Sequence, residues 1–142
     1  MDQTAVQWLS RPYQIAKVIR RKRETIEELR NSLLPAGIRY DRDRVQTSPE
    51  DPILRVESRI DELEREVESL IAERAQSIAD VSYAIESLDD ERTKQVAHCR
   101  YVKQMQIRAI ASTLYMDDAT VYRHLKSTKK QVNEMLRGRA RF

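Results

Sequence analysis

The chain has 142 residues, about one domain, and its 35% charged and 6% aromatic composition is typical of long helices. Two glycines and four prolines leave little material for the tight turns of a strand-rich fold or for a glycine-rich phosphate loop. One cysteine and two histidines form neither a disulfide nor a metal-ligand set, and no apolar stretch is long enough for a membrane span. We therefore expect an all-α protein without a cofactor, a metal site, a catalytic site or a membrane partner.

Charge is distributed unevenly along the chain. The net charge is +3 over residues 1–34, −8 over residues 53–91 and +9 over residues 92–142. A basic C-terminal third beside an acidic middle indicates that the basic segment meets a polyanion, although both segments could instead be solvated helix faces. The N-terminus lacks the basic and apolar regions of a secretory signal, so we expect a cytoplasmic protein.

The first long helix is predicted over residues 12–34, where isoleucines and leucines recur at helical spacing. A short helical turn over residues 5–9 is expected before it, with Trp8 as a buried anchor. Residues 35–52 contain three prolines and one of the two glycines, which predicts that the helix ends and a long loop follows. Arginines and aspartates alternate within this loop, which indicates local pairing or, as the alternative, a polyanion contact.

The second long helix is predicted over residues 53–88, and its apolar residues begin as a heptad repeat. The heptad register would next place Arg74 and Ser77 in the apolar seam, so Ile71 and Ile78 are expected to replace them through a stutter. A seam of this length needs a partner, which is either the first helix folded back or the same helix of another subunit. We expect a helical hairpin or coiled coil over residues 1–88, a homodimer through the central helix, and a separate domain over residues 89–142.

The segment from residue 107 to residue 126 predicts two helices that meet at a turn. The first helix carries an apolar face that includes Ile110 and Ala111, and the second turns Val121 and Leu125 inward. Asp117 is the expected N-cap of the second helix. A short helix, a turn and a capped second helix are typical of a DNA-binding helix-turn-helix.

The outward positions of the second helix are the predicted DNA contacts. Arg123 can donate two parallel hydrogen bonds to guanine, and the lysines can neutralise phosphates. The predicted site on double-stranded DNA consists of Asp118, Ala119, Thr120, Tyr122, Arg123, Lys126, Lys129 and Lys130.

Residues 107–132 resemble the helix-turn-helix of sigma factor region 4, and residues 88–92 with Arg100 and Tyr101 resemble its approach helix. Residues 40–49, reading Tyr-Asp-Arg-Asp-Arg-Val-Gln-Thr-Ser-Pro, resemble a segment in phage-encoded proteins with a helical N-terminal half. Those proteins are similar to the ArpU and RinA class of late-gene transcription regulators. The resemblance implies a phage regulator in the cytoplasm of a bacterial host, with host RNA polymerase as a second partner.

Two residues depart from the helix-turn-helix pattern: Tyr115 stands where glycine is usual in the turn, and His124 stands where an apolar residue is usual. Both bear on the individual contacts more than on the fold. Two other functions fit the same features. A small terminase subunit also joins a helix-turn-helix to an oligomerising helical region, and a coiled-coil adaptor could use the basic tail to bind an acidic protein.

Overall fold

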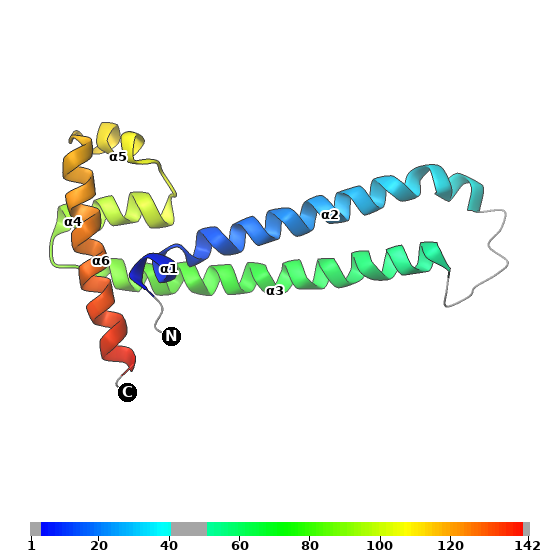
Figure 1. Ribbon diagram of the computed structural model, residues 1–142, viewed down its shortest axis with the longest axis horizontal. Coiled ribbons are helices and arrows are strands. Elements are labelled where there is room, and N and C mark those ends of the chain that lie inside the picture. Colours follow the sequence, from blue (N-terminus) through cyan, green and yellow to red (C-terminus); the bar gives the residue numbers. More distant parts are fainter. Residues whose placement is uncertain (1–3, 41–50, 141–142) are drawn as a thin grey trace. The chain divides into compact units, whose positions relative to one another are not determined.

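The computed structural model describes residues 4–40 and 51–140, which form helices and short connections with no strand in these ranges. The helices are α1 (Ala5–Leu9), α2 (Arg11–Tyr40), α3 (Pro52–Glu86), α4 (Glu91–Ala97), the π-helical turn η1 (His98–Val102), α5 (Ile107–Leu114) and α6 (Asp118–Ala140). The all-α prediction is therefore confirmed (Figure 1). Over the described part of the chain, none of the helices combines the length and the apolar character that crossing a bilayer requires.

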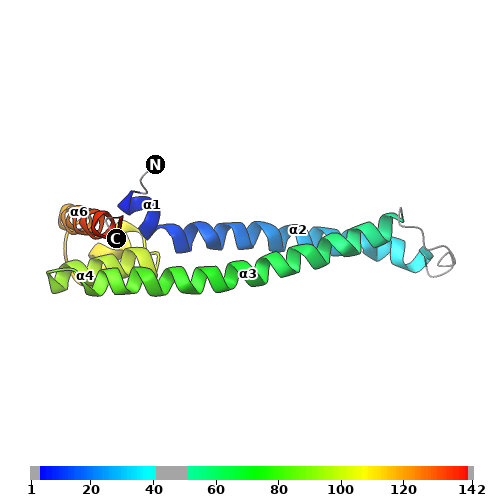
Figure 2. The ribbon, with the colours of Figure 1, turned by 90° about the horizontal axis from the view of Figure 1, so that it is seen from below.

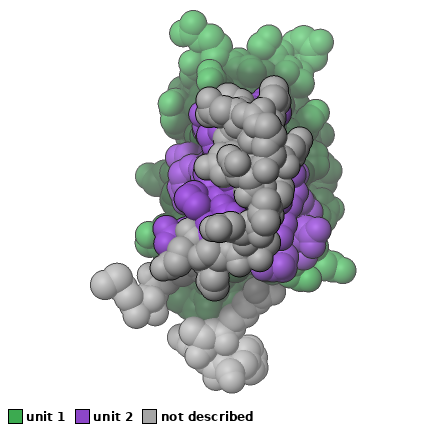
Figure 3. Space-filling view, turned by 90° about the vertical axis from the view of Figure 1, so that its right-hand side faces the viewer, with its two compact units in different colours: residues 1–14, 74–142 green, residues 15–73 purple. Residues whose placement is uncertain are grey.

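The helices group into two compact units, which Figure 3 distinguishes by colour. Unit 1 contains the described residues within 1–14 and 74–142, and unit 2 contains those within 15–73. This division differs from the single boundary at residue 88 expected from the sequence, because the N-terminal helix belongs with the C-terminal helices. A short amphipathic helix joins the core that buries its apolar face, wherever that core lies along the chain.

Unit 2 is an antiparallel pair formed by α2 and α3, which lie side by side in both ribbon views (Figures 1 and 2). Its buried core contains isoleucines of α2 and the predicted seam residues of α3, namely Ile15, Ile19, Ile26, Ile60, Leu63 and Val67. Lys22 pairs with Glu66 and Arg30 with Glu64, each pair at 2.6 Å between nitrogen and oxygen. Of the two partners considered for the seam, this stretch therefore uses the first helix of the same chain.

The predicted end of the first long helix at residue 34 is wrong, because α2 continues to Tyr40. Pro35 lacks one main-chain hydrogen bond, at a cost of about 3 kcal/mol in a helix interior, and this cost does not end the helix. The start of α3 is close to the prediction: Pro52 occupies its first position, and the Ile53 N–H donates to Asp51 Oδ1 at 2.9 Å. The side chains of the predicted 35–52 loop up to residue 50 lie outside the described residues.

The register shift predicted in α3 agrees with the structure at some positions and not at others. Ile71 is 45% exposed and Ser77 is buried, with 4% of its surface exposed, which contradicts the exchange predicted for these two residues. Val81, Ile85 and Leu88 are buried, as the shifted register predicts.

Unit 1 surrounds a second apolar core formed by α1, the end of α3, and the helices from α4 to α6. Thr4 caps α1, with its hydroxyl accepting from the Gln7 N–H at 3.2 Å and its own N–H donating to Gln7 Oε1 at 3.1 Å. The short helix predicted over residues 5–9 is confirmed, but Trp8 is only half-buried. The Ala5 N–H donates to Asn133 Oδ1 at 2.9 Å, which attaches α1 to α6.

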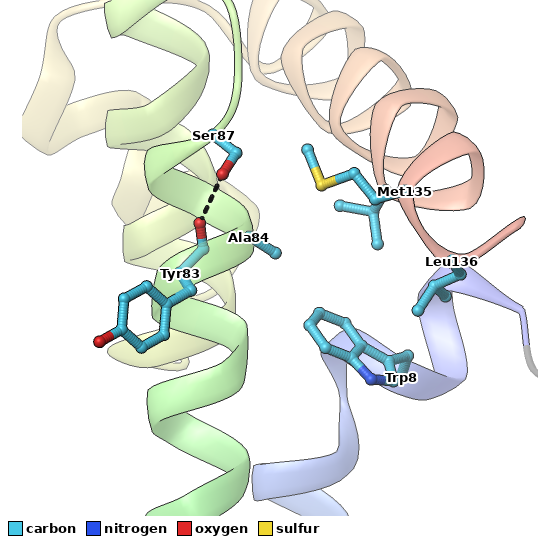
Figure 4. A pocket seen from close by; sticks show the side chains of 7 residues that line it. Trp8, Tyr83, Ala84, Ser87, Met135 and Leu136 are labelled. Carbon is cyan, nitrogen blue, oxygen red and sulfur yellow. Dashed lines mark hydrogen bonds between the residues drawn. The ribbon is translucent and has the colours of Figure 1, made fainter. Parts of the chain in front are cut away.

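A shallow pocket of about 240 Å³ lies among α1, the end of α3 and α6 (Figure 4). Trp8, Ala84, Met135 and Leu136 give it a mainly apolar lining, and the Ser87 hydroxyl donates to the Tyr83 carbonyl at 2.9 Å. None of the described residues that line this pocket is charged. Its lining therefore offers packing surface and no acid–base pair.

Candidate nucleic-acid interface

The interface begins at the connection between α5 and α6. Tyr115 ends α5 in the left-handed region, with φ 56° and ψ 51°, and its N–H donates to the Ala111 carbonyl. The Met116 N–H donates to the same carbonyl at 3.0 Å. A left-handed residue closing a helix satisfies a carbonyl that would otherwise lack a partner, and the chain changes direction between α5 and α6 within three residues. Glycine is usual at such a position, and here a tyrosine adopts the conformation.

Asp117 then caps α6, as the sequence predicts. Its Oδ1 accepts from the Thr120 N–H at 2.8 Å, and its carbonyl accepts from the Val121 N–H at 3.1 Å. Hydrogen bonds from the Thr120 hydroxyl and N–H, together with the nearby charge of Arg123, hold the pKa of Asp117 below its usual value. The carboxylate therefore stays ionised at the positive end of the helix dipole.

The inner face of α6 is apolar and packs on α4 and α5. Its buried residues recur at spacings of three and four and are Val121, Leu125, Thr128 and Val132. Thr128 satisfies its hydroxyl within the helix by donating to the His124 carbonyl at 2.9 Å. Burying this face leaves the opposite face of α6 to solvent.

Two side-chain contacts from α4 fix the positions of α5 and α6. The Thr93 hydroxyl lies 2.8 Å from His124 Nδ1 and 3.1 Å from Asp90 Oδ2, which joins the start of α4 to α6. Arg92 donates to the Leu114 carbonyl at 2.8 Å, so it caps the end of α5. His124 is thus a half-buried histidine with a hydrogen-bond partner, which explains how it replaces an apolar residue.

The predicted contact residues lie on the solvent side of α6. Thr120 is partly buried, and the other seven are exposed, namely Asp118, Ala119, Tyr122, Arg123, Lys126, Lys129 and Lys130. Arg123 Nη2 donates to the Thr120 hydroxyl at 2.9 Å, which directs the guanidinium toward the start of the helix. Helical spacing places Ala119, Arg123, Lys126 and Lys130 in one row opposite the buried face.

The row of exposed cations is interrupted in the second half of α6. The Asn133 side chain accepts a hydrogen bond from α1, and Met135 and Leu136 pack against the unit 1 core. Arg137, seven residues after Lys130 on the same face, is exposed again. The uninterrupted cationic stretch of α6 therefore ends at Lys130, and its length of about three turns matches what a helix can place along a DNA groove.

Sequence reasoning left two exposed side chains out of the site. Tyr115 is 93% exposed at the turn beside the start of α6, although the helix-turn-helix pattern marks it only as a departure from glycine. Arg108 is exposed in the first turn of α5 and contributes to the basic charge of this region. The signal for Tyr115 is its position in the tight turn between two predicted helices, where a side chain points away from the core.

The arrangement brings cations, hydroxyl groups and an aromatic ring together on one helix. Such a face can neutralise phosphates and donate hydrogen bonds to base edges. A scan against protein-family models and searches of curated proteins and of solved structures found no match to this chain.

Proposed function

We propose that the chain is a DNA-binding transcription regulator whose α5–α6 segment acts as a helix-turn-helix on double-stranded DNA. One observation carries the proposal. The N-terminal half of α6 exposes the cations Arg123, Lys126, Lys129 and Lys130 while its opposite face is fully buried. The +9 net charge of residues 92–142 supports it, because phosphate neutralisation supplies most of the affinity in such complexes.

The exposed residues of α6 would make two kinds of contact, to base edges and to phosphates. Arg123, near the start of α6, is placed to read a base edge, where a bidentate arginine contributes about 1–3 kcal/mol of discrimination. Lys126, Lys129 and Lys130 follow along the helix and would contact phosphates, which fix register without reading sequence. Asp118 adds an acceptor that can take a hydrogen bond from a cytosine amino group.

The experiment is selection of bound duplexes from a random pool, followed by fluorescence anisotropy with the selected site across a salt series. Arg123→Ala should lower affinity by about 1–3 kcal/mol and relax the preference at one base pair. Lys126→Ala should weaken all duplexes alike and reduce the slope of log affinity against log salt by about 1. Arg20→Ala and Arg65→Ala are matched controls, since both are exposed arginines of unit 2.

The control variants should bind as the wild type does. If Arg123→Ala and Lys126→Ala leave affinity and salt slope unchanged, or if the controls weaken binding equally, the face assigned to α6 is wrong. Retention of an acidic protein in preference to any duplex would instead support the adaptor function.

The resemblance to sigma region 4 and to late-gene regulators of phages extends the proposal to transcription, with host RNA polymerase as partner. Transcription with bacterial polymerase from a template carrying the selected site should change when the protein is added. A homodimer, if formed, would need a face of α3 other than the one that α2 covers in unit 2. Native mass spectrometry should then give a monomer or dimer, and a large ring would instead indicate a packaging subunit.

A further inference from the structure

A cavity of about 530 Å³ lies within unit 1, between the α1–α2 junction and the segment from η1 to α5. The junction contributes Ser10, Tyr13 and Gln14 to its lining. The other side contributes polar residues from positions 100–106, namely Arg100, Tyr101, Gln104 and Gln106. The volume lies within the range of small-molecule sites, and polar groups converge on it from two segments far apart in sequence. The DNA-binding face of α6 lines no part of this cavity.

Gln104 is the most unusual residue of the lining. Its backbone is left-handed, with φ 58°, which is strained for any residue other than glycine. Its Nε2 is buried, and no group in the described ranges accepts a hydrogen bond from it. A buried donor without an acceptor is unfavourable, and strained residues with such groups concentrate where ligands bind.

The charge of the cavity has one sign. Among the described residues, Arg100 is the only charged residue of the lining, and no aspartate or glutamate of these ranges lines it. Arg100 Nη1 donates to the Met105 carbonyl at 2.9 Å, which holds the guanidinium in place. Within the described residues this bond is the one that engages the Arg100 side chain, and a guanidinium has five donors.

The π-helical turn η1 supplies both Arg100 and Tyr101 to the cavity. Single turns of this kind widen a helix by one residue and recur at functional sites. Burial raises the pKa of the Tyr101 hydroxyl, so it remains a neutral group that can donate a hydrogen bond. The lining as a whole therefore offers donors, one fixed cation and no competing anion.

We propose that this cavity binds a small organic oxyanion, either a phosphate ester or a carboxylate, whose oxygens accept hydrogen bonds from Arg100 and Gln104. Gln104 Nε2 is covered by protein atoms, so its amide must rotate toward the cavity to donate to the bound oxyanion, which also balances the guanidinium charge. The site is separate from the cationic face of α6, so its occupancy does not depend on DNA binding.

The test is isothermal titration calorimetry of the full chain at low ionic strength, with adenosine monophosphate and citrate as the phosphate ester and carboxylate probes. At least one probe should bind saturably at one site per chain, and Gln104→Leu and Arg100→Gln should each weaken that binding at least tenfold. Lys126→Ala and Arg108→Ala are matched controls, because both remove exposed cations that do not line the cavity. They should leave probe binding unchanged, while Lys126→Ala lowers DNA affinity.

Gln104→Leu keeps the test meaningful if Arg100→Gln fails to fold. Leucine removes the unpaired donor at similar volume, so this variant should unfold at a temperature equal to or above that of the wild type. The proposal is overturned if neither probe saturates, if folded Gln104→Leu binds like the wild type, or if Lys126→Ala abolishes probe binding. DNA binding is measured separately. A negative result for the cavity therefore does not contradict the proposed α6 interface, and a negative result for DNA binding does not contradict the proposed cavity site.

Discussion

Tyr115 adopts a backbone conformation that its side chain opposes. A non-glycine residue in the left-handed region costs about 1–2 kcal/mol, and the ring gains little packing because it is 93% exposed. Tyr115→Gly should therefore raise the free energy of unfolding by about 0.5–1 kcal/mol, after the greater entropy of glycine in the unfolded chain is subtracted. Urea unfolding followed by circular dichroism measures this change. Tyr122→Gly is the matched control, and within α6 it should lower stability by about 1 kcal/mol.

Asp117 gives the start of α6 a pH dependence whose sign is fixed by its contacts. Hydrogen bonds from Thr120 and the nearby charge of Arg123 lower the pKa of Asp117 in the folded state below its ordinary value of 3.8. A lowered folded pKa contributes stability above the unfolded value and loses it as the pH falls through the folded value. The wild type should therefore lose more stability than Asp117→Asn between pH 5 and pH 2, because asparagine caps without a charge. Parallel thermal unfolding curves for the two proteins across this range would contradict the prediction.

At the scale of single helices, the different positions of Leu63 and Ile71 on α3 can be tested by two substitutions. Leu63 is buried in the unit 2 core and Ile71 is not, although the predicted stutter places Ile71 in the seam. Leu63→Ala should lower the free energy of unfolding by about 2–5 kcal/mol, because the core loses apolar contacts and gains a cavity. Ile71→Ala should change it by less than about 0.5 kcal/mol. Equal losses in urea unfolding would show that Ile71 also lies in the seam.

The elements that the sequence predicts well are those with local causes. The cap at Asp117 and the turn at Tyr115 arise from groups within four residues of each other, so their positions can be read from the chain. The end of α2 at Tyr40 and the burial of Ser77 in place of Ile71 do not follow from the local signals, because tertiary context can override local propensity. For the candidate site, helical spacing alone identifies the exposed face of α6. Helical spacing cannot show that α1 contacts α6 through the hydrogen bond from the Ala5 N–H to Asn133.

At the scale of the whole molecule, the N-terminal helix stabilises the unit that carries the proposed DNA-binding face. Leu9 is fully buried in the unit 1 core. Leu9→Ala should cost about 2–5 kcal/mol, and hydrogen exchange should show faster exchange in the amides of α6 than in the wild type. The α2–α3 amides of unit 2 should keep their protection. Val6→Ala, at an exposed position of the same helix, should leave both units unchanged.

Uniform loss of protection in both units would show that the chain unfolds as one cooperative body. Loss confined to α1 itself would show that α6 holds its position without the N-terminal helix. Either result would contradict the assignment of α1 to the stability of unit 1.

The hydrogen bond from Ala5 to Asn133 joins residues 128 positions apart. This separation determines when unit 1 can fold during synthesis. A ribosome adds about 5–20 residues per second, so α1 is synthesised on the order of ten seconds before the residue that receives it. During that interval α2 and α3 are both available and can pair, since their contacts close sooner along the nascent chain. Trp8 and Leu9 meanwhile lack the surface that buries them. We therefore expect the α2–α3 pair of unit 2 to form first during synthesis, and unit 1, which includes α1 and α6, to complete its core last.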